Sequence, residues 1–283
     1  MHRCIDSNMD KDKIKISIII IAKNEEKKLP DCLKSVKWAD EIILIDSGSE
    51  DGTKKIAIEF GAKVCEYKGG NYSDWRNEGL KRASREWLLY IDADERVTQE
   101  LKDEIISLTT NDQSPDHAGR PANISAYAIP RKNIILGKEM KHGGWWPDYV
   151  KRLFKKDKLK GWVGELHEEP VLQGELGYLK NPLIHIKHDN LSEMLEKTNK
   201  WSEIEAKLLY HAGHPKMSWW RFPRIMLSEL WLRLIIKMGF LDGVEGVIYA
   251  IYQMWSRFVT YGKLWEMQLK THNSKLIYEG SNL

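Results

Sequence analysis

The sequence predicts an α/β fold in which a mostly parallel, Rossmann-like central sheet has a mixed second half and is followed by a C-terminal α-helical appendage. Three observations predict it. Apolar runs typical of buried parallel strands alternate with helical patterns over the first 110 residues. Short strand-like runs, separated by glycine and basic residues, follow between residues 124 and 190. From Leu191 onward the apolar residues recur at helical spacing.

The first half repeats a strand and helix pattern. Ile14 to Ala22 is nearly all β-branched, as expected for a strand covered on both faces, and Leu29, Cys32 and Leu33 then share one face of a helix. The same criteria predict strands over 14–22, 41–45, 62–67 and 87–91, and helices over 25–36, 53–60, 74–83 and 99–108. Residues 14–110 are therefore expected to form an alternating half-domain.

The remainder divides into a loop, a mixed half and a helical region. Residues 111–123 are rich in Asp, Ser, Pro and Gly, which predicts a surface loop. Strands are expected over 127–131, 149–154 and 183–188, and helices over 191–208, 221–238 and 242–261. We therefore expect a disordered lead at 1–13, an α/β domain at 14–190 with halves at 14–110 and 124–190, and a helical region at 191–283.

Composition excludes some functions. Lys and Arg total 44 against 41 Asp and Glu, and a net charge of +3 gives no broad positive field, so we expect no nucleic-acid partner. The 3 cysteines are far apart and lack metal-binding spacing, which is typical of a reducing compartment. No apolar run reaches the roughly 18 to 20 residues of a membrane span, and the polar N-terminus does not resemble a secretion signal. We expect a cytoplasmic protein.

Polar residues follow three of the predicted strands, at Asn24 to Glu26, Asp46 to Ser49 and Asp92 to Glu95. Ligands of doubly wound sheets bind outside the carboxyl ends of the strands, so these residues are the candidate site. The first strand lacks the Gly-x-Gly-x-x-Gly motif, which argues against a dinucleotide cofactor. Asp46 suits a uracil-type base, whose N–H a carboxylate accepts. The alternative is that Asp46 only forms an Asx-type turn with the residues that follow it.

Asp92 and Asp94 end a buried strand with one small residue between them. Mg²⁺ and Mn²⁺ prefer oxygen ligands and commonly bind through one or two carboxylates together with substrate phosphates. Such a cation neutralises a departing diphosphate. The alternative is that the two acids serve as a helix N-cap and a solvated loop residue.

These residues resemble the ordered signature of family 2 glycosyltransferases with the GT-A fold. The resemblance rests on Ser17 to Glu26, Ile45 to Thr53 and Tyr90 to Glu95, three motifs in order. It continues through three further stretches and a C-terminal one, which look like the subset acting on bacterial lipopolysaccharide cores, typified by the β-1,4-glucosyltransferases: Gly144 to Asp148, Arg152 to Phe154, Leu166 to Glu169 and Gly239 to Gly243. The resemblance covers nearly the whole chain and is densest over residues 14 to 100.

The resemblance implies a nucleotide-sugar donor, most simply UDP-glucose, and a Mg²⁺ or Mn²⁺ cofactor. It places Asn24 and Glu26 near the nucleoside, Asp46 on the base, and Asp92 and Asp94 on ribose, diphosphate and metal. The halves at 14–110 and 124–190 then become a nucleotide-sugar half and an acceptor half.

Candidates for the base and for acceptor contacts lie in the second half. An inverting transfer needs one general base, for which we select Glu168, with Glu169 as its neighbour and Glu165 as a third candidate. The alternative is a solvated acidic loop. His185 is a candidate third metal ligand and His188 a weaker one, although a lone histidine is more often structural. The acceptor residues expected from the resemblance are Trp145, Trp146, Asp148 and Arg152, with core packing of one indole as the alternative.

The C-terminal region has the composition of an interfacial helix. Of the 12 tryptophans, six lie after residue 200, and Arg221 to Met238 mixes apolar with basic residues. We therefore expect a peripheral membrane protein on the inner face of the cytoplasmic membrane, acting on a lipid-linked glycan such as a lipopolysaccharide core. The alternative for these helices is a cap on the catalytic domain or a homodimer interface.

Two rival functions belong to other classes. A nucleotidyltransferase acting on sugar phosphates also uses paired acids, but it would show a Gly-rich, basic loop after the first strand, which this chain lacks. A non-catalytic, membrane-associated glycan-binding module is disfavoured by the presence of Asp92, Asp94 and Glu168.

Overall fold

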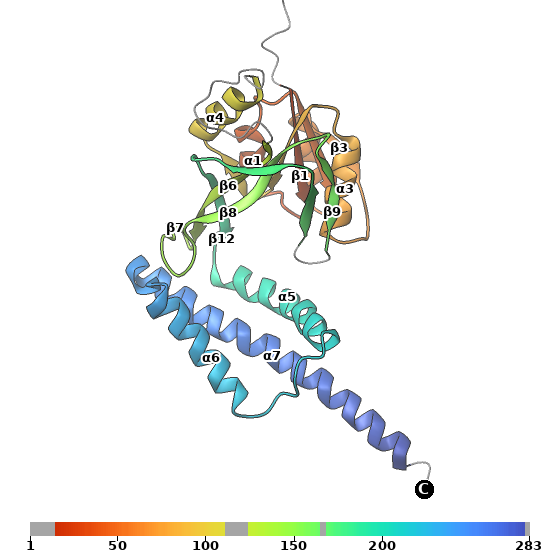
Figure 1. The fold of residues 1–283 in the computed structure, drawn as a ribbon, viewed down its shortest axis with the longest axis vertical. Coiled ribbons are helices and arrows are strands. Elements are labelled where there is room, and N and C mark those ends of the chain that lie inside the picture. The colour runs from red at the N-terminus through yellow and green to blue at the C-terminus, as the bar shows by residue number, and fades with distance from the viewer. Residues whose placement is uncertain (1–14, 111–123, 165–167, 281–283) are drawn as a thin grey trace, which may run out of the picture. The chain divides into compact units, whose positions relative to one another are not determined.

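The computed structural model describes residues 15–110, 124–164 and 168–280, the last ten of these as backbone only (Figure 1). The predicted lead at 1–13, the predicted loop at 111–123 and the candidate Glu165 lie outside the described residues. The chain forms two compact units, which we call unit 1 (Met1–Lys132 and Asp148–His185) and unit 2 (Asn133–Pro147 and Ile186–Leu283).

The first half of the unit 1 sheet is parallel. Strands β1 (Ile16–Ala22), β2 (Glu41–Asp46), β3 (Lys63–Glu66) and β4 (Trp87–Asp92) lie in the order β3-β2-β1-β4. The register pairs Ala22 with Asp46 and Ile21 with Asp92, so the strands end at one edge. The side chains of Ile18, Ile19 and Ile20 have no exposed surface, which is why β-branched residues dominate β1.

Helices cover both faces of this sheet. On one face, the buried side chains of α1 (Leu29–Ser35), α2 (Thr53–Glu59) and α4 (Gln99–Thr110) pack with Ile18 and Ile20. On the other face, α3 (Tyr72–Arg82) contributes Trp75 and Leu80 to a cluster with Ile19 and Tyr90. Helix α1 begins at Leu29 and not at the expected residue 25, because residues 24–26 bind the loop after β2.

The second half of the sheet is mixed. Strands β8 (Asp148–Lys155), β6 (Ile124–Ile135), β12 (Leu183–His188) and β5 (Glu95–Val97) continue the sheet from β4. β11 (Glu175–Tyr178) pairs with the start of β6 in parallel, whereas β9 (Leu159–Val163) and β10 (Glu169–Leu172) form a separate hairpin. The predicted arrangement of the sheet, with a parallel first half and a mixed second half, is confirmed.

Unit 2 is helical. Helices α5 (Leu191–His211) and α6 (Arg221–Trp231) pack along the long helix α7 (Gly243–Gly280), as Figure 1 shows. The helix expected over 221–238 changes to a π-helix, η1 (Leu232–Ile236), and is followed by a 3₁₀ turn, η2 (Gly239–Asp242). The predicted C-terminal helical appendage is confirmed. None of the described helices has the length and apolarity that a membrane crossing needs.

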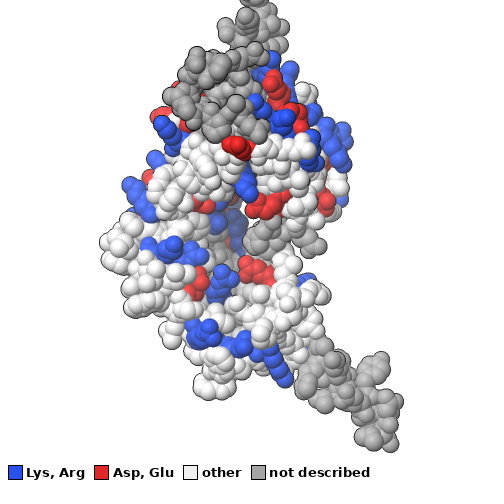
Figure 2. Space-filling model, in the orientation of Figure 1, with Lys and Arg blue, Asp and Glu red and all other residues white. Residues whose placement is uncertain are grey.

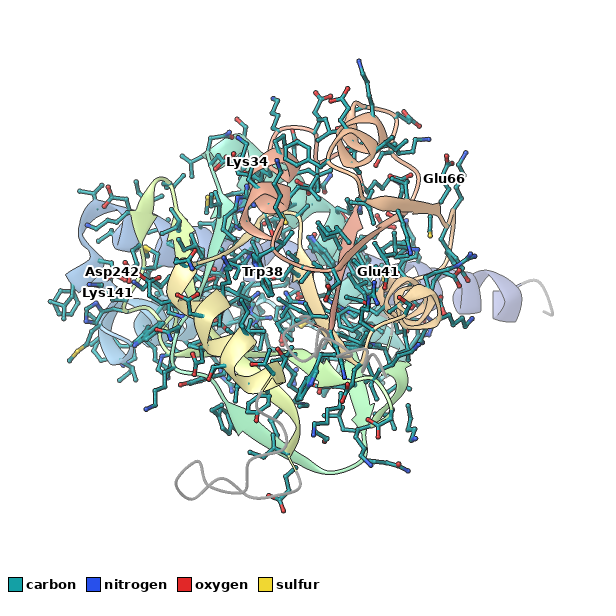
Figure 3. All side chains as sticks on the ribbon, turned by 90° about the horizontal axis from the view of Figure 1, so that it is seen from above. Lys34, Trp38, Glu41, Glu66, Lys141 and Asp242 are labelled. Carbon is teal, nitrogen blue, oxygen red and sulfur yellow. The ribbon has the colours of Figure 1, made fainter. Side chains whose placement is uncertain are left out.

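Residues 133–147, which the sequence assigns to the α/β domain, pack within unit 2. They carry the short strand β7 (Lys138–Glu139). Asp242, of which 4% is exposed, accepts hydrogen bonds from the backbone N–H groups of Lys141 (3.2 Å) and His142 (2.8 Å), and Figure 3 shows Asp242 beside Lys141. The Trp145 indole packs against Tyr249 of α7, with ring centroids 5.1 Å apart.

Lys and Arg are interspersed with Asp and Glu over the face drawn in Figure 2, in keeping with the small net charge.

Candidate active site

Two loops at the carboxyl ends of β1 and β2 are fastened to each other by side chains that the sequence singled out. Asn24 adopts the left-handed conformation (φ 56°), which Asn tolerates better than most residues. Its Oδ1 accepts the N–H of Glu50 at 2.9 Å, and Glu26 Oε2 accepts the N–H of Gly52 at 2.9 Å. These bonds fix the rim at which a nucleoside is expected.

Asp46 is fully buried at the end of β2. Its Oδ2 accepts the N–H groups of Gly48 at 3.1 Å and Ser49 at 3.0 Å, so the Asx-type turn considered as the alternative is present. A contact between Asp46 and the base, and contacts from Asn24 and Glu26 to the nucleoside, stay predictions.

Asp92 lies between two arginines at the end of β4. Its Oδ2 is bonded to Nη2 of Arg152, and its Oδ1 lies 3.5 Å from Nη2 of Arg76. Burial by itself would raise the pKa of Asp92, but the charges of Arg152 and Arg76 outweigh burial and hold the pKa of this carboxyl well below its usual range. Asp92 is therefore an anion at neutral pH, placed at the sheet edge.

Arg76 is a buried charge that the sequence analysis missed. Its side chain is 5% exposed; Nε donates to Glu168 Oε1 at 2.8 Å, and the guanidinium stacks 4.8 Å from the centroid of the Trp162 ring. Arg76 falls on the buried stripe of α3 with Ser73 and Gly79, at helical spacing. A charged residue among the buried positions of this helix could have been recognised in the sequence. It indicates a buried ion pair, because buried charges need partners.

A second carboxylate, that of Glu95, binds two of the arginines that line the site. Glu95 has no exposed surface, and its Oε1 accepts from Arg152 at 2.8 Å and from Arg131 at 3.3 Å. Arg152 lies where the pairing of β8 with β6 shifts register, a bulge of the kind that re-aims a side chain beside a functional site. Arg131 also binds Asp148, at 2.8 Å. The predicted acceptor residues Asp148 and Arg152 are thus engaged in ion pairs, and their contact with an acceptor stays a prediction.

The structure brings Asp94 and His185 together. β5 and β12 pair antiparallel with His185 opposite Glu95, and this register places His185 Nε2 3.6 Å from Asp94 Oδ2. A cation with bonds of about 2.0 to 2.3 Å can bridge two such atoms. Across the described ranges, no group of three or more His, Cys, Asp or Glu side chains is gathered to hold a metal, so phosphate oxygens would supply further ligands. The pair fits a Mg²⁺ or Mn²⁺ site of that type.

Asp92 and Glu168 line a pocket of about 380 Å³ together with Arg76, Lys151 and Arg152. The Glu168 side chain is 15% exposed and bound by Arg76, whereas that of Glu169 is 66% exposed and paired with Lys151. The buried and oriented carboxylate is the one selected from the sequence as the general base.

Tyr72, at the start of α3, is a further residue that the sequence did not indicate. Burial first, and then the negative charges of Asp92 and Glu168, raise the pKa of Tyr72 to about 12. Its hydroxyl stays protonated at neutral pH close to both carboxylates. Asn71 caps this helix by accepting the Asp74 N–H at 3.1 Å, which fixes the turn that carries Tyr72.

The two tryptophans predicted to contact the acceptor belong to unit 2. Trp145 is 8% exposed and packed against Tyr249, the core role considered as the alternative. Trp146 is 45% exposed. His188, the weaker metal candidate, also belongs to unit 2, where its ring lies 6.3 Å from that of Tyr252. Acceptor binding by the indoles stays a prediction.

Residues 17–134 match the family described as Glycosyl transferase family 2. This chain therefore contains a family 2 glycosyltransferase domain. It is 25% identical over 278 residues to the lipopolysaccharide core biosynthesis glycosyltransferase LpsC of Rhizobium meliloti (strain 1021), covering 90% of this chain and 93% of that protein. It is 28% identical over 272 residues to an uncharacterized glycosyltransferase of Rickettsia conorii, covering 92% and 93%.

Solved structures show partial similarity. TarS residues 1–349 from S. aureus are 15% identical, with a TM-score of 0.40 and 92% of each chain covered. Glucosyl-3-phosphoglycerate synthase from Mycobacterium tuberculosis in complex with phosphoglyceric acid is 16% identical, with a TM-score of 0.46 and 76% and 87% covered.

Proposed function

We propose that this protein is an inverting, metal-dependent glycosyltransferase that moves a sugar, most simply glucose from UDP-glucose, to a lipid-linked glycan. One observation carries the proposal. The pair Asp94 and His185 is held at the same sheet edge as a pocket that contains the arginine-bound carboxylates Asp92 and Glu168. The match to family 2 indicates the class of reaction, and the pocket contains carboxylates that such a reaction can use.

Asp94 and His185 are the residues that would hold Mg²⁺ or Mn²⁺, which supplies neutralisation of the leaving diphosphate. Arg76 and Arg152 add fixed positive charge beside Asp92. This charge offsets the repulsion between the carboxylates of the pocket and the negatively charged diphosphate of the donor. We assign Asp92 to the ribose and Asp46 to the base.

Glu168 is the general base. The acceptor hydroxyl oxygen attacks C1 of the donor sugar, its proton passes to a carboxylate oxygen of Glu168, and the bond from C1 to the phosphate oxygen breaks with its electron pair leaving on the nucleoside diphosphate. The Arg76 bond to Oε1 orients the carboxylate. One base suffices because attack from the opposite face inverts the configuration in a single step.

Similarity to LpsC over nearly the full length of both chains favours a lipopolysaccharide core glycan as the acceptor. Such an acceptor is presented on a membrane, and unit 2 has a surface that suits one. Trp219 is 82% exposed, Leu227 63% and Trp231 60%, and none of the residues of α6 is buried. The Arg221 and Arg224 guanidiniums lie 5.4 and 5.9 Å from the Trp220 ring.

Exposed indoles beside arginines are the composition of an interfacial helix. We therefore propose peripheral attachment to an anionic membrane through this surface, which we call the α6 face: Trp219, Trp220, Arg221, Arg224, Leu227 and Trp231. A homodimer through the same face is the alternative, and it predicts concentration-dependent self-association.

A thermal-shift panel tests the donor site. UDP-, GDP- and CMP-sugars, each with and without Mn²⁺ or Mg²⁺, are added to the wild type, to Asp94→Ala and to His185→Ala. A ligand bound by the native state raises the melting temperature. We expect a rise with UDP-glucose that requires the cation and is lost in both variants.

The control is Asp157→Ala, whose carboxylate is 69% exposed on the turn between β8 and β9. A cation-dependent rise that survives in both Asp94→Ala and His185→Ala would reject the metal assignment. A rise with sugar 1-phosphate and a nucleoside triphosphate, and with no nucleoside diphosphate sugar, would favour a nucleotidyltransferase. Glycan binding without any nucleotide response would favour the non-catalytic module.

A further inference from the structure

We propose that Tyr149 and Tyr178 form a platform on which a pyranose ring of the acceptor glycan stacks, beside Glu168. This inference rests on the proposed function and adds a binding site for its second substrate. Tyr149 is 44% exposed and Tyr178 62%, and they are the exposed large aromatic side chains among the described residues of unit 1. Two exposed aromatic side chains in contact, beside a polar pocket, are typical of a ligand site.

Strand register brings the two rings together. Tyr149 of β8 pairs with Pro130 of β6, and Tyr178 of β11 pairs with Ala128 on the other side of β6. Ala128 has only a methyl group between the flanking strands, so the rings meet across it, with centroids 5.2 Å apart and planes at 90°. The perpendicular rings form a corner, in which one ring offers its face and the other its edge.

The position of β11 is fixed by a glycine. A Cβ at Gly177 would lie 2.7 Å from the Tyr127 ring, so only glycine lets β11 lie this close to β6 at that point. The backbone that carries Tyr178, the next residue, is therefore fixed, and the Tyr178 ring packs edge to face with that of Tyr149. A fixed aromatic ring loses little conformational entropy when a ligand stacks on it.

The corner has polar neighbours on the pocket side. Tyr149 lines the same pocket as Glu168, and Lys151, which pairs with Ala128, lines it as well. The Lys151 ammonium binds the Glu169 carboxylate, so a donor and an acceptor of hydrogen bonds lie next to the rings. An apolar corner flanked by such a pair matches a pyranose, which has a C–H face and a rim of hydroxyl groups.

Kinetics with the full chain test the platform. The donor is UDP-glucose with Mn²⁺, and the acceptor probe is core oligosaccharide released from lipopolysaccharide by mild acid. In Tyr149→Ala and Tyr178→Ala we expect the acceptor KM to rise about three- to tenfold while the donor KM changes less than about twofold, since each variant removes one ring of the stacking surface for the acceptor. The Phe variants keep the ring and should recover most of the affinity. Ile58→Ala, on the exposed face of α2, is the control for removal of exposed apolar surface.

A binding measurement makes the test independent of turnover. The protein is labelled with 3-fluorotyrosine, and the fluorine resonances of Tyr149 and Tyr178 are assigned by their Phe variants. Titration with the same oligosaccharide in the presence of UDP should shift both resonances with a saturable dependence. Absence of a shift in both, or an unchanged acceptor KM in both Ala variants, would overturn the platform. Saturable shifts in a protein that transfers sugar from none of the nucleotide sugars would support the platform and reject the proposed function.

Discussion

Buried arginines set the charge of the pocket at the scale of single residues. Arg76 and Arg152 have side chains that are 5% exposed, and both contact Asp92. Removing either one would leave a carboxylate without its compensating charge, which costs far more than losing an exposed ion pair. The two arginines therefore hold Asp92 as an anion in this pocket.

The base assignment is tested by Glu168→Gln, which preserves the size of the side chain and removes its basicity. We expect turnover to fall by about 10² to 10⁴ while the affinity for UDP-glucose is retained, because a positioned base acts on the chemical step. Glu169→Gln is the matched control, since Glu169 adjoins Glu168 but is exposed. An active Glu168→Gln together with an inactive Glu169→Gln would move the assignment to the neighbour.

The acids of the site could be predicted from the sequence, but their arginine partners could not. Asp92 and Asp94 directly follow a recognisable strand, so the general position of ligand sites in α/β sheets located them. Arg76 binds Glu168 across 92 residues of chain, a pairing that only the folded structure creates. His185 was found as a candidate, whereas the register of β12 against β5 that brings it to Asp94 was not.

At the scale of elements, one buried carboxylate joins the amino end of β2 to its neighbours. Glu41, labelled in Figure 3, accepts from Ser17 Oγ of β1 at 2.5 Å, from Lys63 Nζ of β3 at 2.7 Å and from the Ser84 N–H after α3 at 2.8 Å. Burial by itself would raise the pKa of Glu41, but these hydrogen bonds outweigh burial and lower the pKa to about 2.

Glu41→Gln should therefore destabilise the protein in a pH-dependent way. The folded pKa lies below the unfolded value of about 4.3, so the stabilisation is fully present above that value and is lost as pH falls toward the folded pKa. We expect a loss on the order of 2 kcal/mol at pH 7, and a smaller difference from wild type at pH 3.5. Urea unfolding at pH 7, 5 and 3.5 measures it, with the exposed Glu59→Gln as control. A difference that does not change with pH would contradict the assignment.

Long elements with a clear period were predicted well, and short ones were missed. The parallel strands β1, β2 and β4 were found because buried strands need continuous apolar residues. β5, β10 and β11 have three or four residues, too few to show alternation, and their pairing is decided by distant strands. The π-helix η1 gave no signal, because its composition matches that of the α-helix before it.

At the scale of the whole molecule, the chain combines an α/β unit that carries the candidate chemistry with a helical unit that carries the α6 face. The sequence predicted both parts, since their apolar periods differ. It did not predict that residues 133–147 belong with the helices, because this grouping depends on contacts such as those of Asp242 with residues 141 and 142.

Membrane attachment is tested by co-sedimentation with anionic liposomes. Arg221→Glu with Arg224→Glu, and Trp219→Ser with Trp231→Ser, should each weaken binding of the full chain at least about tenfold, since each basic residue near an anionic surface contributes about 1 kcal/mol and each indole buries apolar area. Wild-type binding should also weaken at high salt. Lys200→Glu, on the exposed side of α5, is the control. Equal sedimentation of all variants would reject the membrane role, and self-association lost with the two tryptophans would favour a dimer.

We propose that this pocket transfers a sugar from a UDP-sugar with inversion, using Glu168 and a cation held by Asp94 and His185. Proton NMR of a reaction with UDP-glucose, Mn²⁺ and core oligosaccharide measures it directly, because the anomeric coupling reports the configuration of the new bond. We expect a β-linked glucose formed from the α-linked donor, with one UDP released per transfer, and at least about a hundredfold less product from Glu168→Gln or Asp94→Ala. An α-linked product, or a β-linked product formed equally well by both variants, would contradict it.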